Sequence, residues 1–194
     1  VVHGKCSLLN KQFGSYDDKF AGDRAFMGYM IAHPGKKLMF MGAEFGQFKE
    51  WNYKEGLEFF LKDYEKHAKL DRFFTELNKL YLTEPALFGD DDGWDGFEWL
   101  AADDKDLNSL AFVRKFGGEK IIVAINFSGT DIKYRFAAEK GNYKVLFDSD
   151  KKIYGGDGKR RKRVYKTEKK EWNGKPYSLE VDLPKLSFIY LKNK

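Results

Sequence analysis

The spacing of hydrophobic positions divides the chain into two parts. Up to about residue 88 the apolar side chains recur with the period of a helix, whereas from about residue 90 they alternate with polar ones, with the period of a strand. The stretch 15–33 is nearly all apolar after its first turn, and Ser15 and Asp18 stand at capping-box spacing at its start. A helix is therefore predicted there, ending before the Pro-Gly pair that follows.

A strand and a second helix are predicted in the rest of the first part. The segment KKLMFMG (36–42) has the continuous apolar character of a strand buried on both faces, as in parallel sheets. Residues 64–82 carry an apolar stripe at helical spacing, and Pro85 follows shortly after. The stripe consists of Leu70, Phe73, Phe74, Leu77, Leu80 and Tyr81. The order helix, strand, helix predicts part of an α/β repeat.

Eight short strands are predicted in the second part, separated by turn sequences such as SGT, KGN and WNGK. The predicted strands are 97–100, 109–116, 120–127, 131–136, 143–149, 162–167, 177–183 and 186–192. Many short strands with alternating faces are typical of an antiparallel β-sandwich. The sequence therefore predicts two domains, residues 1–88 and residues 89–194.

Composition limits the classes of protein to be considered. The chain has 194 residues, of which 42% are hydrophobic and 17% aromatic, and this is enough to bury a core. No apolar run approaches the roughly 20 residues needed to cross a bilayer, so we expect no membrane partner. The single cysteine, Cys6, cannot form an internal disulfide. Such cysteine usage is typical of a reducing compartment, and a cytoplasmic protein is expected.

The net charge of +5 includes a basic run, KRRKR, at residues 159–163. With Tyr165 and Trp172 nearby, this run has the composition of a surface that binds single-stranded nucleic acid. The basic residues alternate in a hairpin pattern, however, and Glu168 and Glu171 lie close to them. The pattern favours a solvated hairpin, so no nucleic-acid partner is expected.

Carboxylates and an aromatic ring follow the predicted strand 36–42. Functional groups gather at strand ends in parallel α/β folds, so Glu44 and Glu50 are candidates for acid and base in glycoside chemistry. Trp51 beside them suits stacking on a sugar ring. The alternatives are that Glu44 orders the neighbouring loops, that Glu50 is simply exposed and that Trp51 covers the rim of the fold. The three histidines show no ligand spacing with Cys6, so no metal site is predicted.

Five segments carry a more specific signal: VVHGK (1–5), AHPGKKLMFMGAEFGQFKEWN (32–52), GLEFFL (56–61), LNKLYLTEPAL (77–87) and GFEWL (96–100). Together they closely resemble the C-terminal part of bacterial 1,4-α-glucan (glycogen) branching enzymes of the α-amylase superfamily. The resemblance implies an α/β plus all-β architecture. Residues 1–88 would be the last part of a (β/α)8 TIM barrel, and residues 89–194 the all-β C-terminal domain of that superfamily.

The resemblance also implies a function in glycogen biosynthesis. Branching enzymes are glycosyltransferases that cleave an α-1,4-glucan chain to a covalent glycosyl-enzyme and transfer it to a 6-hydroxyl, which makes an α-1,6 branch. This retaining transfer needs no metal and no cofactor, and its partner is an α-glucan. In the family a catalytic Asp lies in a Ser-His-Asp-Glu segment directly before VVHGK, and the other two catalytic carboxylates lie further upstream. We therefore expect the catalytic residues upstream of Val1, none in this chain, and no activity of the chain alone.

By the same resemblance, five residues are expected to bind substrate. His3 and Lys5 would lie in the loop after the seventh barrel strand. Glu44, Gln47 and Trp51 would lie in the loop after the eighth strand, beside the acceptor or donor glucan.

A second hypothesis comes from the class of binding modules, in which the chain is a stand-alone, non-catalytic glucan-binding or scaffold module. Under either hypothesis the edge of the predicted strand 36–42 and the apolar stripes of the helices would lack neighbours, which favours self-association. The sandwich is expected to fold by itself, whereas residues 1–88 would be ordered only when packed on the sandwich, on other barrel segments or on a second copy.

Overall fold

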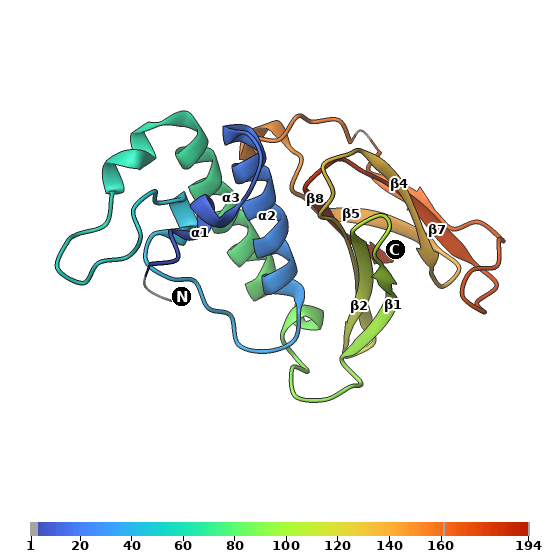
Figure 1. Ribbon diagram of the computed structural model, residues 1–194. Helices are drawn as coiled ribbons and strands as arrows, with labels where there is room; N and C mark the ends of the chain where they lie inside the picture. Colours follow the sequence, from blue (N-terminus) through green and yellow to red (C-terminus); the bar gives the residue numbers. More distant parts are fainter. Residues whose placement is uncertain (1–3, 161, 194) are drawn as a thin grey trace.

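Two long helices pack side by side against one face of a β-sandwich in the computed structural model (Figure 1). The structure describes residues 4–160 and 162–193. Helix α2 (Tyr16–Ala32) and helix α3 (Glu65–Thr83) confirm the two predicted helices. The short helices are α1 (Leu8–Lys11), η1 (Ala43–Phe45), η2 (Phe59–Asp63), η3 (Pro85–Leu87) and η4 (Lys152–Tyr154).

Helix α2 begins with the predicted capping box. The Ser15 hydroxyl accepts a hydrogen bond from the backbone N–H of Asp18, and the Asp18 carboxylate accepts one from the backbone N–H of Ser15. Lys185, in the sandwich, donates a further hydrogen bond to Asp18 at 2.7 Å. This lysine, together with Ser15, lowers the pKa of Asp18 to about 2. The cap therefore also links the helix to the sandwich.

The predicted strand 36–42 is wrong. Residues 36–40 have no regular secondary structure, and Met41 and Gly42 turn the chain with φ values of 44° and 80°. A strand needs a neighbour with which to exchange backbone hydrogen bonds, and no described strand pairs with this segment. Its apolar side chains remain accessible: Leu38 is 75% exposed and Phe40 is 38% exposed.

The eight predicted strands are confirmed. They are β1 (Phe97–Asp104), β2 (Ser109–Phe116), β3 (Glu119–Asn126), β4 (Ile132–Ala137), β5 (Asn142–Asp148), β6 (Val164–Lys166), β7 (Ser178–Leu183) and β8 (Ser187–Asn193). Strands β1-β2-β3-β8-β5-β6 form one antiparallel sheet in that order, and β4 and β7 form a second. The predicted antiparallel β-sandwich is therefore present.

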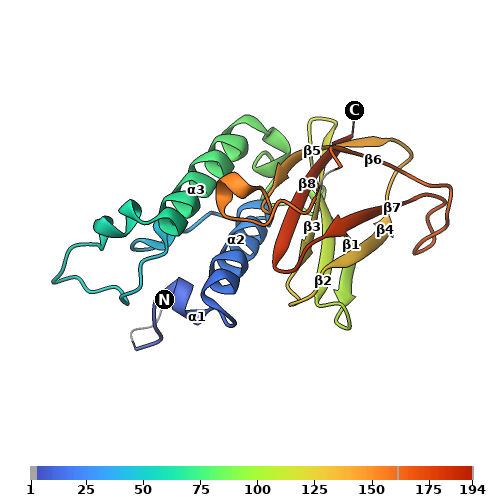
Figure 2. The same ribbon diagram turned by 90° about the horizontal axis from the view of Figure 1, so that it is seen from above.

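The six-stranded sheet is covered on both faces (Figure 2). Along β3, Ile121, Val123 and Ile125 belong to a core shared with α2 and α3. Ile122 and Ala124 point the other way, into the core formed with β4 and β7. Alternate residues of a strand point to opposite faces of the sheet, so successive side chains of β3 contribute to the two cores in turn.

Candidate functional site

The loop from Ala43 to Glu58 carries most of the predicted site residues. It starts with the short helix η1, which lies between Gly42 and Gly46. Both glycines have left-handed φ values, 80° and 70°, which an amino acid with a side chain adopts only with strain. The two glycines thus let the chain reverse twice within a few residues and bring Gln47 back under η1.

Two side chains hold this loop closed. The Gln47 amide is buried; its oxygen accepts from the backbone N–H of Glu58 at 3.0 Å, and its nitrogen donates to the carbonyl of Lys49 at 3.2 Å. The Glu58 carboxylate in turn accepts from the backbone N–H groups of Phe48 and Lys49, at 3.0 and 2.9 Å. These bonds satisfy backbone donors that a helix or sheet would otherwise pair. Gln47 therefore positions the loop from within.

His67 anchors the same loop to both long helices. Its Nδ1 lies 2.8 Å from the carbonyl oxygen of Phe45, and because a carbonyl only accepts, Nδ1 donates. The other ring nitrogen then accepts from the Tyr16 hydroxyl at 3.2 Å. The rings of Phe20 and Phe48 pack edge-on against the imidazole. Sequence reasoning considered His67 only as a metal ligand and overlooked both His67 and Glu58 as loop anchors, since no local spacing pairs either residue with its distant partner.

Trp51 borders an apolar pocket of about 250 Å³. The indole packs edge-on against the Phe40 ring, with centroids 5.7 Å apart. The pocket is lined by Cys6, Ser7, Leu8, Leu9, Phe26, Met27, Met30, Leu38, Phe40, Met41, Ala43, Gln47, Lys49 and Trp51. No described carboxylate lines it, so the geometry suits an apolar ring face or another protein segment rather than acid–base chemistry.

The other predicted site residues lie around this pocket. Lys5 is exposed, and its backbone N–H donates to the Glu50 carboxylate at 3.3 Å. Glu44 is half-buried in η1 and is not among the residues that line the pocket. His3 lies outside the described residues. The fold thus brings Lys5, Gln47 and Trp51 into one region, with Glu50 held by the backbone beside Lys5.

The described residues of the basic run, 159–160 and 162–163, lie beside carboxylates of the sandwich. Arg160 is buried and forms an ion pair with the buried carboxylate of Asp148, whose pKa burial nevertheless raises. Lys159 binds Asp131 at 2.9 Å. Lys162 lies 3.7 Å from Asp182. Arg160 therefore differs from the predicted solvated hairpin, because it lies in the core, whereas Lys159, Lys162 and Arg163 are exposed as predicted.

Two further findings concern the parts of the chain that the structure describes. No helix there is long and apolar enough to cross a membrane. The same residues contain no cluster of three or more histidine, cysteine or acidic side chains that could hold a metal ion.

Sequence comparison relates the whole chain to one group of enzymes. Residues 99–194 match the family described as "Alpha amylase, C-terminal all-beta domain". A 1,4-alpha-glucan branching enzyme GlgB from Halothermothrix orenii is 42% identical over 197 residues, which cover 99% of this chain and 31% of that protein. The enzyme of the same name from Fusobacterium nucleatum is 45% identical over 200 residues, covering 100% of this chain and 32% of that protein. The chain therefore spans about a third of the length of these relatives.

A solved structure shares the fold. The native form of the Nostoc punctiforme debranching enzyme superposes with a TM-score of 0.65 over 100% of this chain and 34% of that chain, at 18% sequence identity. At this level of identity the likeness concerns the fold alone.

Proposed function

We propose that the chain acts as the C-terminal part of a glycogen branching enzyme. It is homologous over its whole length to that part of 1,4-alpha-glucan branching enzymes. Its residues 99–194 belong to the alpha-amylase C-terminal all-beta domain family. The reaction would be retaining transfer of an α-1,4-glucan segment to a 6-hydroxyl, in the cytoplasm and without a cofactor. The observation that carries the proposal is the 42–45% identity that extends over both the helical part and the sandwich.

We further propose that residues 1–88 form the end of a TIM barrel and residues 89–194 its C-terminal domain. The exposed apolar side chains around the loop support this division, because a surface of this kind fits packing against further barrel segments. Leu38 is 75% exposed, Phe59 is 60% exposed and Phe60 is 58% exposed.

Within that barrel, the loop from Ala43 to Glu58 would lie at the active-site face. We propose that Trp51 provides a stacking surface for the glucan and that Lys5 and Glu44 contact its hydroxyl groups, with His3 on the same loop as Lys5. Gln47 would act mainly by positioning the loop, since both ends of its amide are bound to the backbone.

A chimera tests the proposal. This chain would replace the matching C-terminal part of the Halothermothrix orenii enzyme, and formation of α-1,6 branches from amylose would be measured. We expect a folded, active chimera, because the helix–sheet packing that the chain brings is internal to it. A control chimera with Gly28→Leu, which disrupts that packing, should lose both stability and activity. A folded chimera without branching activity would overturn the proposal.

One observation favours a second candidate, a non-catalytic glucan-binding module. The pocket beside Trp51 has an aromatic border but no carboxylate among its described lining residues. Under this hypothesis the 194 residues alone should be retained on immobilised amylose, while the chimera stays inactive. Under the first hypothesis the chimera is active and the chain alone forms no branches.

A further inference from the structure

Side chains bind all four backbone polar groups of Phe48 and Lys49, in a segment that is neither helix nor strand. The N–H groups of both residues donate to one carboxylate oxygen, Oε2 of Glu58, at 3.0 and 2.9 Å. The Phe48 carbonyl accepts from the Asn10 amide at 2.8 Å, and the Lys49 carbonyl accepts from the Gln47 amide at 3.2 Å. The position of this segment therefore depends on side chains that lie elsewhere in the sequence.

Glu58 is itself held in place, where the loop ends and η2 begins. Its backbone N–H donates to the side-chain oxygen of Gln47 at 3.0 Å, and its carbonyl accepts from the backbone N–H of Leu61 at 2.9 Å. Leu61 is buried, so η2 is anchored in the protein. The half-buried Glu58 side chain thus reaches the segment 48–49 from a fixed position, as a residue that supports a binding site must.

The residues that Glu58 holds form part of the wall of the apolar pocket. Gln47, Lys49 and Trp51 all line this pocket, whereas Glu58 does not. Glu58 is bonded to Gln47 and to the backbone of Lys49, and Trp51 follows Lys49 by two residues. A change at Glu58 would therefore reach a ligand in the pocket through these residues rather than by direct contact.

We propose that Glu58 is a positioning residue for the use of glucan, because it fixes this wall and, through it, the indole of Trp51. The assignment rests on the proposed function. Without an acceptor at position 58 the two N–H groups would lose their partner, and the segment would move toward water to satisfy them. A misplaced binding group lowers the rate even when it is remote from the reacting atoms. Since Trp51 would bind the glucan before and during the reaction alike, its displacement should raise KM more than it lowers kcat.

Two substitutions separate the hydrogen-bond acceptor from the rest of the side chain. Glu58→Gln keeps a carbonyl oxygen that can accept from both N–H groups, whereas Glu58→Met has a similar length and no oxygen. In the chimera we expect Glu58→Met to lower kcat/KM for amylose by about tenfold, mostly through KM, and Glu58→Gln to stay within about twofold of the wild type.

The matched control is Glu55→Met. Glu55 is exposed on the same loop, and its carboxylate accepts from the side chains of Lys49 and Asn52 rather than from the backbone of the segment 48–49. Because exposed ion pairs contribute little, this variant should have the kinetics of the wild type.

Amide hydrogen exchange in the 194-residue chain measures the positioning directly. The N–H groups of Phe48 and Lys49 should exchange about tenfold faster in Glu58→Met than in the wild type or in Glu58→Gln. The melting temperature is recorded for every variant, because a purely structural role would lower it without changing KM. If Glu58→Met does not fold, Glu58→Asp takes its place. Its shorter side chain keeps the charge and draws the acceptor away from the two N–H groups, so KM should rise, although less.

Three results would overturn the proposal. They are wild-type kinetics of a folded Glu58→Met chimera, an equal rise of KM in Glu58→Met and Glu58→Gln, and unchanged exchange of the two N–H groups. An inactive wild-type chimera would refute the proposed function, and hydrogen exchange would then still decide whether Glu58 fixes the segment 48–49. An active chimera in which Glu58→Met leaves KM unchanged refutes only this inference.

Discussion

At the scale of the residue, the indole of Trp51 is the clearest candidate for contact with substrate. Trp51 lines the apolar pocket and is half-buried. Part of the side chain therefore packs against the protein, and the rest is accessible to a ligand. In the chimera we expect Trp51→Ala to lower kcat/KM for amylose. The decrease should correspond to a loss of about 1–3 kcal/mol of transition-state stabilisation, the range for losing an aromatic stacking surface. The melting temperature should change little. Tyr53→Ala, at a neighbouring tyrosine that is 78% exposed and does not line the pocket, is the control. Normal kinetics with a large loss of stability would mean that Trp51 serves to cover the fold.

Asp23 should make stability depend on pH. Its side chain is fully buried in α2, and neither carboxylate oxygen has a hydrogen-bond partner among the described residues. Burial raises its pKa from 3.8 to about 7, against a smaller opposite effect of Arg24. The folded state therefore keeps a proton that the unfolded state releases, so the contribution of Asp23 to stability is fully present below pH 3.8 and is lost as pH rises to about 7.

We expect Asp23→Asn to remove this dependence. Relative to the variant, the wild type should lose roughly 2–4 kcal/mol of unfolding free energy between pH 4 and pH 8. Urea unfolding at both pH values measures the difference, and comparing the two proteins cancels the effects of the other carboxylates. Parallel pH profiles would show that Asp23 is ionised in the folded state.

At the scale of the element, the approach of α2 to the sheet depends on Gly28. A Cβ atom at this position would lie 2.1 Å from Cε1 of Phe188, and the Tyr190 hydroxyl donates to the Gly28 carbonyl. Gly28→Ala should therefore destabilise the chain by about 1–3 kcal/mol, although alanine favours the helix itself. Gly56→Ala is the matched control, because nothing lies within 4 Å of a Cβ built there. Chemical denaturation of both variants checks the prediction; an equal effect of the two substitutions would show that α2 has room to move away from the sheet.

At the scale of the whole molecule, the helical part and the sandwich share one core. Phe73 of α3 contacts Phe147, Tyr154 and Phe188 with ring centroids 5.7–6.0 Å apart. Although the sequence predicts that the sandwich folds by itself, this shared core leads us to expect one cooperative unfolding transition for the chain.

Residues 89–194 made alone should accordingly be less stable than in the whole chain and should associate, because a face of the large sheet loses its cover. Circular dichroism during urea unfolding and light scattering measure the two effects. The whole chain is the reference in both measurements. Because the whole chain also exposes apolar residues, such as Leu38, its own self-association is measured by light scattering and compared with that of the sandwich. A monomeric sandwich with an unchanged midpoint would contradict the prediction.

The sequence by itself determined the elements whose signals are local. Ser15 and Asp18 predict the start of α2, and the alternation of apolar and polar residues in 109–127 predicts β2 and β3. Both signals are local, because a helix cap and a strand face depend on residues a few positions apart. The segments shared with branching enzymes likewise identified the relatives that sequence comparison found. The five proposed substrate-binding residues stay predictions.

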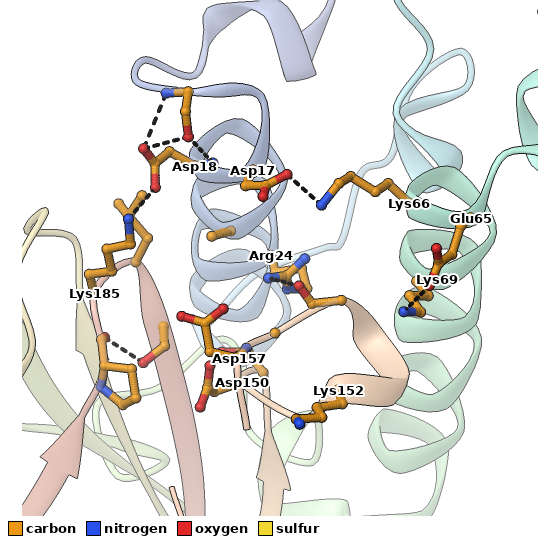
Figure 3. Close-up of a pocket in the computed structure, with 18 residues that line it drawn as sticks. Asp17, Asp18, Arg24, Glu65, Lys66, Lys69, Asp150, Lys152, Asp157 and Lys185 are labelled. Carbon is orange, nitrogen blue, oxygen red and sulfur yellow. Dashed lines mark hydrogen bonds and ion pairs between the residues drawn. The ribbon is translucent and has the colours of Figure 1, made fainter. Parts of the chain in front are cut away.

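Only the tertiary structure decided what depends on distant partners. Residues 36–40 read as a strand but have no described strand to pair with, so their apolar character produces an exposed segment instead. His67 and Glu58 became loop anchors, and Arg160 of the basic run became half of a buried ion pair, through contacts that no local spacing predicts. The hollow of about 600 Å³ between the helices and the sandwich (Figure 3) has the same origin, since its wall combines residues 15–24 and 65–69 with residues 149–157 and 184–187. The physical reason is common to all of these features: hydrogen bonds and ion pairs between distant residues form only after the hydrophobic cores bring their elements together.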